Sequence, residues 1–200
     1  MTYKAILFDL GRVLVHFDFK RVYQRLETIC PHAATEIPRV LSTTGLAQRF
    51  ESGRIEPAEF IAEITRVLSL EMPPEEFCDT FNCIFTDTLV PESLLETLAA
   101  RYRLVLLSNT NAIHFPWIRE RYPLLRHFHD LVLSYEVKAM KPDPEIYRAA
   151  VAKAGCRPEE CFYTDDIAQF VEGARAVGID AVQFVDAAQL ERELRARGIL

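Results

Sequence analysis

Short apolar segments alternate with amphipathic ones along most of the chain, beginning with the stretch at 3–8. Apolar runs of this kind predict strands, and they recur at 104–107, 130–133, 161–164 and 181–185. The segments that separate and follow the later strands have helical periodicity, at 91–101, 112–121, 144–155, 168–177 and 187–197. Because short strands that alternate with helices indicate a parallel sheet covered on both faces, we expect a doubly wound, Rossmann-like α/β domain.

The interval between the first two predicted strands is too long for a simple connection. From about residue 15 to residue 90 the pattern is helical and includes no convincing strand, with helices predicted at 19–30, 35–45, 57–70 and 74–85. A crossover between parallel strands normally needs one helix, so this interval indicates an inserted module. We predict a discontinuous α/β core of residues 1–14 and 91–200, and an α-helical cap of residues 15–90.

Composition and charge exclude several classes of function. The chain has 50% hydrophobic and 26% charged residues, which is typical of a soluble globular protein and not of a disordered one. The formal charge of −6 argues against nucleic acid or an acidic membrane surface as a partner. No apolar run approaches the roughly 20 residues that span a bilayer, and the N-terminal pattern is not that of a signal peptide. Five cysteines without a CxxC pair favour free thiols, so we expect a cytoplasmic protein; no pattern indicates its oligomeric state.

Polar residues follow the predicted strands at the points where open α/β sheets bind ligands. The first strand ends at Asp9, the second at the segment 108–111, and the fourth at Asp165 and Asp166, while Lys141 lies in the loop after the third. Taken singly, each has an ordinary explanation as a helix cap, a turn residue or an exposed loop lysine. The carboxyl ends of parallel strands meet at one edge of the sheet, so we expect these side chains to converge there.

This combination of side chains favours phosphoryl chemistry. Carboxylates that lie close together need a cation, and an all-oxygen set of ligands suits Mg²⁺. A carboxylate beside Mg²⁺ and a lysine can attack phosphorus and form an aspartyl phosphate, which water then hydrolyses. Ser108, neighbouring backbone N–H groups and Lys141 would bind the phosphoryl oxygens.

The same residues fall within four motifs, which read FDLGRVL (8–14), LLSNTN (106–111), MKPDPEIY (140–147) and FYTDDIAQFVEGARAVGI (162–179). In order and spacing they resemble the four motifs of the haloacid dehalogenase (HAD) superfamily, and the resemblance covers the whole predicted core. The insertion resembles a C1-type helical cap, with FESGRI (50–55) in its middle. Within the superfamily, the chain looks most like capped bacterial phosphatases.

The resemblance implies a role for each matching position. Asp9 would be the nucleophile and a Mg²⁺ ligand, and the substrate would be a small phosphorylated metabolite such as a sugar phosphate. Cap closure would exclude water and select that substrate. The other implied roles are phosphate binding by Ser108, Asn109 and Lys141, and metal binding by the backbone carbonyl of Gly11, by Asp166 and, as a second ligand or water-holding group, by Asp165.

One position departs from the family pattern in a way that affects the mechanism. The superfamily usually has an aspartate two residues after the nucleophile as general acid and base, whereas this chain has Gly11. Loss of a positioned acid or base costs on the order of 10²–10⁴-fold in rate. His16 and Asp18 are candidate substitutes, although a linker side chain and a helix cap are their ordinary explanations. Glu51 and Arg54 of the cap are candidates for facing the substrate, but we favour a solvated helix end for both.

Two alternatives to a Mg²⁺-dependent phosphatase stay open. A 2-haloacid dehalogenase uses an aspartate nucleophile on carbon without a metal, and adjacent Asp165 and Asp166 argue against it because that chemistry has no use for a cation site. A weakly active binding protein on the same scaffold is the second alternative, and Gly11 is its support.

Overall fold

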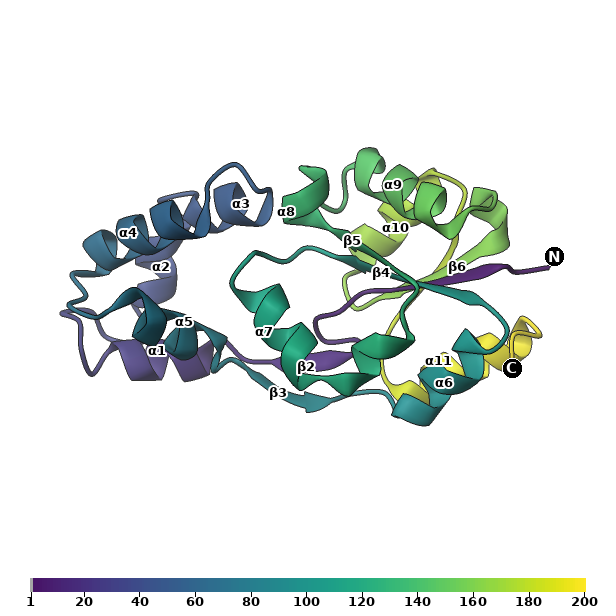
Figure 1. The fold of residues 1–200 in the computed structure, drawn as a ribbon, viewed down its shortest axis with the longest axis horizontal. Coiled ribbons are helices and arrows are strands. Elements are labelled where there is room, and N and C mark those ends of the chain that lie inside the picture. The colour runs from purple at the N-terminus through teal and green to yellow at the C-terminus, as the bar shows by residue number, and fades with distance from the viewer. Residues whose placement is uncertain (1) are drawn as a thin grey trace.

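The computed structural model describes residues 2–200, and a five-stranded sheet forms its centre (Figure 1). The strands are β1 (Ala5–Phe8), β4 (Arg103–Ser108), β5 (Asp130–Leu133), β6 (Cys161–Asp165) and β7 (Asp180–Gln183). They lie in the order β5-β4-β1-β6-β7, and every pair of neighbours is parallel. This arrangement confirms the expected doubly wound α/β core. It places β1 between β4 and β6, where the strand order reverses, so the end of β1 lies at the position that binds ligands in such sheets.

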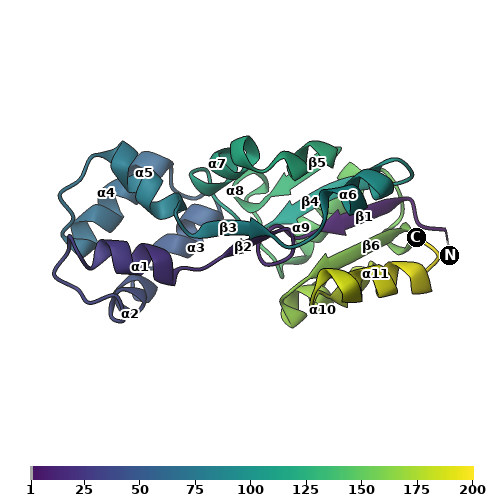
Figure 2. The same ribbon diagram turned by 90° about the horizontal axis from the view of Figure 1, so that it is seen from below.

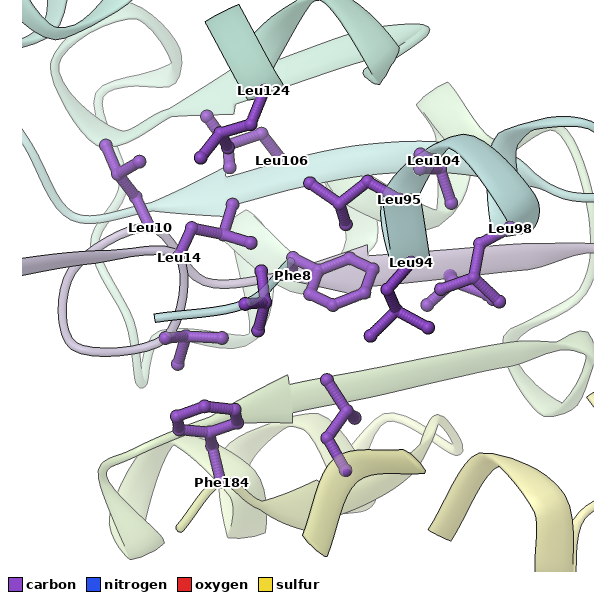
Figure 3. Close-up of a cluster of buried hydrophobic side chains, with 14 of the residues drawn as sticks. Phe8, Leu10, Leu14, Leu94, Leu95, Leu98, Leu104, Leu106, Leu124 and Phe184 are labelled. Carbon is purple, nitrogen blue, oxygen red and sulfur yellow. The ribbon is translucent and has the colours of Figure 1, made fainter. Parts of the chain in front are cut away.

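Helices cover both faces of the sheet, because side chains alternate between the faces along each strand. Ile6 and Phe8 of β1 belong to one buried cluster, while Ala5 and Leu7 belong to another. The first cluster is covered by α6 (Glu92–Ala99), α7 (His114–Arg121) and α11 (Ala187–Ala196), and the second by α9 (Pro144–Ala154) and α10 (Ala168–Ala176). Figure 3 shows Phe8 among the leucines of α6 and β4 in the first cluster. These five helices agree with the predicted ones to within two residues at each end.

Shorter elements complete the core at the ends of the strands. A four-residue helix, α8 (Ser134–Val137), follows β5 directly, and two 3-10 helices are η1 (Pro123–His127) and η2 (Pro158–Glu160). None of the helices within residues 2–200 is long and apolar enough to cross a membrane.

Five short helices gather at the other end of the molecule, and we use the name cap for residues 15–90, which contain them (Figure 1). They are α1 (Lys20–Leu26), α2 (Ile37–Ser42), α3 (Leu46–Glu51), α4 (Pro57–Leu68) and α5 (Pro74–Asn82). Their apolar side chains form a third buried cluster, to which Ile113 of the core contributes. The helix predicted at 35–45 is present in shorter form as α2, whereas α3 was not predicted; Gly45, which adopts a left-handed conformation with φ of 64°, lies between them.

The expectation that the cap includes no strand is also wrong. β2 (Val15–Phe17) and β3 (Phe85–Thr88) form an antiparallel ribbon in which Phe17 pairs with Phe85. Each strand has only three or four residues, which is too short for a two-residue alternation to be detected against the helical pattern around it. Figures 1 and 2 show this ribbon between the cap helices and the sheet, where it carries the chain into and out of the cap.

Candidate active site

Three carboxylates converge at the carboxyl edge of the sheet. Asp9 follows β1, Asp165 is the last residue of β6, and Asp166 comes next, and one oxygen of each lies within 4.8 Å of the others. The backbone N–H of Asp9 donates to the carbonyl of Thr164 at 3.1 Å, which continues the pairing of β1 with β6. Asp9 and Asp165 are buried, with 7% and 0% of their surface exposed, and Asp166 is half-buried. So much negative charge is stable there only with cationic neighbours.

Lys141 supplies one such neighbour. Its Nζ lies 2.7 Å from Asp9 Oδ1 and 2.6 Å from Asp165 Oδ2, and it also donates to the Tyr163 hydroxyl at 3.1 Å. Burial alone would lower the pKa of Lys141, but the charges of the two aspartates outweigh it and raise that pKa, so the ammonium stays charged. Burial raises the pKa of the Asp9 carboxyl, and the Lys141 ammonium opposes that rise. Lys141 is therefore not the exposed loop lysine that its sequence context alone would suggest.

Asn109 fixes the backbone from which Lys141 projects. Its Oδ1 accepts from the Lys141 N–H at 2.8 Å, and its Nδ2 donates to the Lys141 carbonyl at 3.1 Å. Because the carboxamide Nδ2 uses only one of its two N–H groups in this way, its second N–H and the backbone N–H are the Asn109 donors left for a phosphoryl group. Ser108 is 2% exposed and lines a cleft of about 90 Å³ together with Asn109 and Gly11.

Asp165 and Asp166 differ in what they can do for a cation. Asp165 Oδ2 accepts from Lys141 and from the Tyr163 hydroxyl, and Asp165 Oδ1 accepts from the Ile167 N–H at 2.9 Å. No side-chain hydrogen bond or ion pair within residues 2–200 involves the Asp166 carboxyl, whose pKa is raised by burial and by the charge of Asp165.. The oxygens free for a cation are therefore those of Asp166 and the second oxygen of Asp9, and these hard oxygen donors fit Mg²⁺.

Phe17 fills the space where a side chain at position 11 would lie. A Cβ atom added to Gly11 would be 2.6 Å from Cε1 of Phe17, closer than real Cβ atoms approach other heavy atoms. The guanidinium of Arg12 covers the same ring, 5.1 Å from its centroid. The site is thus built around glycine at this position, with an aromatic ring in place of the usual acid.

His16 and Asp18 lie near the start of the cap, and neither is among the residues that line the cleft. His16 is exposed, and its Nδ1 is 2.9 Å from the Thr86 hydroxyl across the β2–β3 ribbon. The Asp18 carboxylate accepts from the N–H of Lys20 at 2.9 Å, at the first residue of α1. These contacts favour the structural explanations, and a role in proton transfer stays a prediction for both.

Three residues near the site were missed or misread in the sequence. Glu51 lines the cleft, so the interpretation as a solvated helix end is wrong for it, whereas Arg54 is exposed. Tyr163 lies two positions before Asp165 in the same strand, so the two-residue alternation of strands could have identified its contact with the site. Phe17 had no such signal, because its short strand was not predicted.

A parallel α/β core with clustered carboxylates and a buried lysine at its strand ends, beside a helical cap, is the arrangement that the resemblance of the four motifs implies. A sequence profile of the haloacid dehalogenase-like hydrolases matches residues 3–178, so the chain belongs to this family. That result confirms the resemblance of the four motifs.

Similar proteins extend over the whole chain. D-ribitol-5-phosphate phosphatase from Bacteroides thetaiotaomicron is 27% identical over 199 residues, which is 96% of each chain. A sesquiterpene phosphatase from Aspergillus oryzae is 25% identical over 198 residues, 97% of this chain and 96% of the relative. A HAD family enzyme from Bacteroides thetaiotaomicron, crystallised with magnesium and inorganic phosphate, has a TM-score of 0.81 and 30% identity, over 92% of this chain and 95% of that one.

Proposed function

We propose that this protein is a Mg²⁺-dependent phosphatase that hydrolyses a small phosphomonoester through an aspartyl phosphate on Asp9. The observation that carries the proposal is the buried contact of Lys141 with Asp9 and Asp165, with the free Asp166 carboxyl beside them. Two relatives bear the names of phosphatases, and a similar structure holds magnesium and phosphate, which supports the same chemistry here.

In the first step, a carboxylate oxygen of Asp9 forms a bond to phosphorus while the bond from phosphorus to the ester oxygen breaks. The alcohol leaves with a proton, and the phosphoryl group stays on Asp9. Lys141, the Ser108 hydroxyl and the Asn109 N–H bind the phosphoryl oxygens. Water then attacks phosphorus, releases inorganic phosphate and restores Asp9. Mg²⁺, held by Asp9, Asp166 and the carbonyl of Gly11, would offset the charge of the carboxylates and the phosphoryl group.

The leaving group is a separate question, because relatives of similar identity carry names that differ in this respect. Ribitol is a polyol, and a sesquiterpene is a hydrocarbon. The names of these relatives therefore support two classes of substrate, and the sugar phosphate expected from the sequence belongs to one of them. Selection between the two classes would depend on the side chains of the cap.

Phosphate release from a panel of phosphorylated metabolites tests the proposal. We expect Mg²⁺-dependent turnover that is abolished by EDTA and by Asp9→Asn. Acid-quenched samples of the wild type should contain a peptide phosphorylated at Asp9. Phosphate release that survives EDTA would contradict the proposed role of Mg²⁺, and release of halide from a 2-haloacid in EDTA would favour dehalogenase chemistry. If no compound is turned over above the Asp9→Asn control, the scaffold is a binding protein.

A further inference from the structure

The cap encloses a cavity of about 330 Å³, within the size range of small-molecule sites. Most of its lining is apolar and comes from all five cap helices, and its buried apolar members are Val22, Leu26, Leu46, Phe50, Phe60, Ile64 and Phe77. Clusters of such side chains normally pack with few voids larger than a water molecule. A space of this size inside the third hydrophobic cluster therefore has room for an apolar ligand.

The cavity adjoins the active-site cleft. Phe19, Glu51, Asn111 and His114 line both spaces, and the cleft continues from them to Ser108 and Asn109 at the end of β4. A phosphomonoester with its phosphoryl group at Ser108 would therefore extend its organic part toward the cap cavity.

His114 adds an observation that points to a ligand at this junction. It is only 5% exposed, and its Nε2 is buried without a hydrogen-bond partner within residues 2–200. Its Nδ1 lies 2.8 Å from Asn82 Oδ1, and burial lowers the pKa of His114 to about 3, so the ring is neutral. With Nδ1 donating to Asn82, Nε2 is an acceptor without a donor, a cost that a water molecule at the junction would offset while an alkyl chain occupies the apolar part of the cavity.

We propose that the cap cavity binds the leaving group of the substrate, and that this group is an apolar alcohol, alkyl, alkenyl or aromatic, and not a sugar or polyol. The inference rests on the proposed phosphatase function. Few polar atoms line the cavity, so the hydroxyl groups of a polyol would lose their hydrogen bonds to water without replacement. An alkyl chain would instead gain from each methylene that it buries.

A homologous series of n-alkyl phosphates and the matching non-hydrolysable n-alkylphosphonates tests this proposal. We expect kcat/KM for the esters, and calorimetric affinity for the phosphonates, to rise about fourfold per added methylene until the cavity is full. D-ribitol 5-phosphate should be a poorer substrate than hexyl phosphate. A flat series, or a preference for D-ribitol 5-phosphate, overturns the inference.

The two compounds in each pair separate failure of the inference from failure of the proposed function. Phosphonate affinity does not depend on turnover, so affinity that rises with chain length supports the cavity even if no ester is hydrolysed. Hydrolysis of acetyl phosphate that Asp9→Asn removes would report on the aspartate chemistry without using the cavity.

Ala47→Phe is the variant designed to fill part of the cavity, because Ala47 lines the cavity and lies on an exposed part of α3. Its neighbour Gln48 is also exposed but does not line the cavity, so Gln48→Phe is the control. We expect Ala47→Phe to shorten the alkyl chain of highest affinity and Gln48→Phe to leave it unchanged. Equal effects of the two variants would contradict the assignment of the cavity.

A different observation concerns the proton that the leaving group needs. Position 11 cannot supply it, and the end of α3 is held over the cleft by a close contact with the core. The carbonyl of Gly53 accepts from Lys138 Nζ at 2.6 Å, and a Cβ added to Gly53 would be 2.1 Å from the Tyr135 carbonyl oxygen. Figure 1 shows the end of α3 beside α8 at this contact. Glu51 lies two residues before Gly53, so this contact fixes its place at the cleft.

The Glu51 carboxyl has no ion pair and no side-chain hydrogen bond within residues 2–200, although it is half-buried. Burial raises the pKa of this carboxyl to about 7, so both its acid and its base forms are populated near neutral pH. The other ionisable side chains that line the two spaces are Tyr23 of α1 and the neutral His114 of α7.

The geometry points to Glu51 as the general acid and base of the reaction. As the bond from phosphorus to the ester oxygen breaks, its electron pair goes to that oxygen, which takes the proton of the Glu51 carboxyl. The Glu51 carboxylate then accepts a proton from the water that attacks the aspartyl phosphate, which returns the residue to its starting state.

Dependence on the leaving group tests this role. An alkoxide is a poor leaving group without a proton, whereas acetate leaves readily from acetyl phosphate. We expect Glu51→Gln to lower kcat/KM for hexyl phosphate by about 10²–10⁴-fold and kcat/KM for acetyl phosphate far less, because kcat/KM excludes the later hydrolysis of the aspartyl phosphate that both substrates share. In the wild type, the rate of hexyl phosphate hydrolysis should fall as the pH rises above about 7. This fall should be absent in Glu51→Gln. Acetyl phosphate turnover also shows that the variant is folded.

Glu56→Gln is the control, because Glu56 is exposed in the same loop region and lines neither space. Equal losses of kcat/KM for both substrates in Glu51→Gln would assign Glu51 a structural role and overturn the inference. The same conclusion would follow if His16→Ala or Asp18→Asn, and not Glu51→Gln, removed hexyl phosphate turnover.

Discussion

The strand-end site of the core and the cavity of the cap differ in whether their polar groups have hydrogen-bond or ion-pair partners. In the core, Lys141 contacts two carboxylates and a hydroxyl, and both polar atoms of the Asn109 carboxamide and both oxygens of Asp165 are engaged. At the cap junction, Glu51 and Nε2 of His114 have no partner within residues 2–200. The core thus holds a fixed charge arrangement, as the proposed phosphoryl chemistry requires, while the few polar groups at the cap junction remain unpaired, as the proposed leaving-group site requires.

Removal of Lys141 should have the largest effect, because it breaks the fixed arrangement of the core. In Lys141→Met, Asp9 and Asp165 lose their buried cation, and we expect the free energy of unfolding in EDTA to fall by about 3–5 kcal/mol. The kcat for acetyl phosphate should fall by at least about 10²–10³-fold. Denaturant unfolding and steady-state kinetics measure the two effects. Lys153→Met is the control, since Lys153 is exposed on α9, and equal losses in both variants would contradict the role of Lys141.

Gly53→Ala should separate the two regions. Gly53 has φ of 63°, and the Cβ added by the substitution would clash with the Tyr135 carbonyl. The turn at residue 53 must therefore adopt a strained conformation or move away from α8. We expect the variant to lose about 3 kcal/mol of stability, from left-handed strain and overpacking together. Hexyl phosphate turnover should fall more than acetyl phosphate turnover, because Glu51 loses its position.

Gly45→Ala is a matched control for that prediction. Gly45 has φ of 64°, but nothing lies within 4 Å of the added Cβ, so only backbone strain of about 1 kcal/mol remains. If Gly45→Ala changes the ratio of the two substrates as much as Gly53→Ala does, contact between α3 and α8 does not position Glu51.

Gly11→Asp introduces the acid that relatives commonly have, at the border between the two regions. Because the Phe17 ring occupies that space, we expect slower turnover and a stability loss of about 1–3 kcal/mol, rather than a gain in rate. Phe17→Ala combined with Gly11→Asp should recover part of both losses, as kinetics and thermal unfolding of the double variant would show. A faster enzyme after Gly11→Asp alone would mean that the ring moves aside and that the native site only lacks an acid.

The core site was predictable from the sequence because topology fixes it. Asp9, Ser108 and Asp165 each end a recognisable apolar strand, and parallel strands bring their ends together whatever the details of packing. The role of each residue within the site was harder to predict from the sequence. The two hydrogen bonds of Asn109 with the Lys141 backbone, and the contact of Lys141 with Asp165 Oδ2, join segments more than 20 residues apart.

The cap was predictable as a helical insertion but not as a site. Helical periodicity identifies the buried face of α3, yet the position of Glu51 depends on how the turn at Gly53 packs against α8, which is a contact between residues 85 positions apart. Phe17 lies in a ribbon whose strands are too short to leave a pattern. Local sequence patterns do not encode such long-range packing, so the places of Glu51 and Phe17 beside the cleft were the ones missed.

The smallest expected effect is the pH dependence of stability that Glu51 contributes. The folded protein raises the pKa of this carboxyl to about 7, above the ordinary value of about 4.3, so the folded state binds the Glu51 proton more tightly than the unfolded state does. The resulting stability is fully present below the ordinary pKa and is lost as the pH rises through about 7.

Glu51→Gln lacks this loss, so the variant should gain stability relative to the wild type between pH 5 and pH 8. Because Glu51 is only half-buried, solvent screening keeps the gain to about 1 kcal/mol or less. Thermal unfolding of both proteins at the two pH values measures it, and a difference that is the same at pH 5 and pH 8 would show that the Glu51 carboxyl titrates as it does in the unfolded chain.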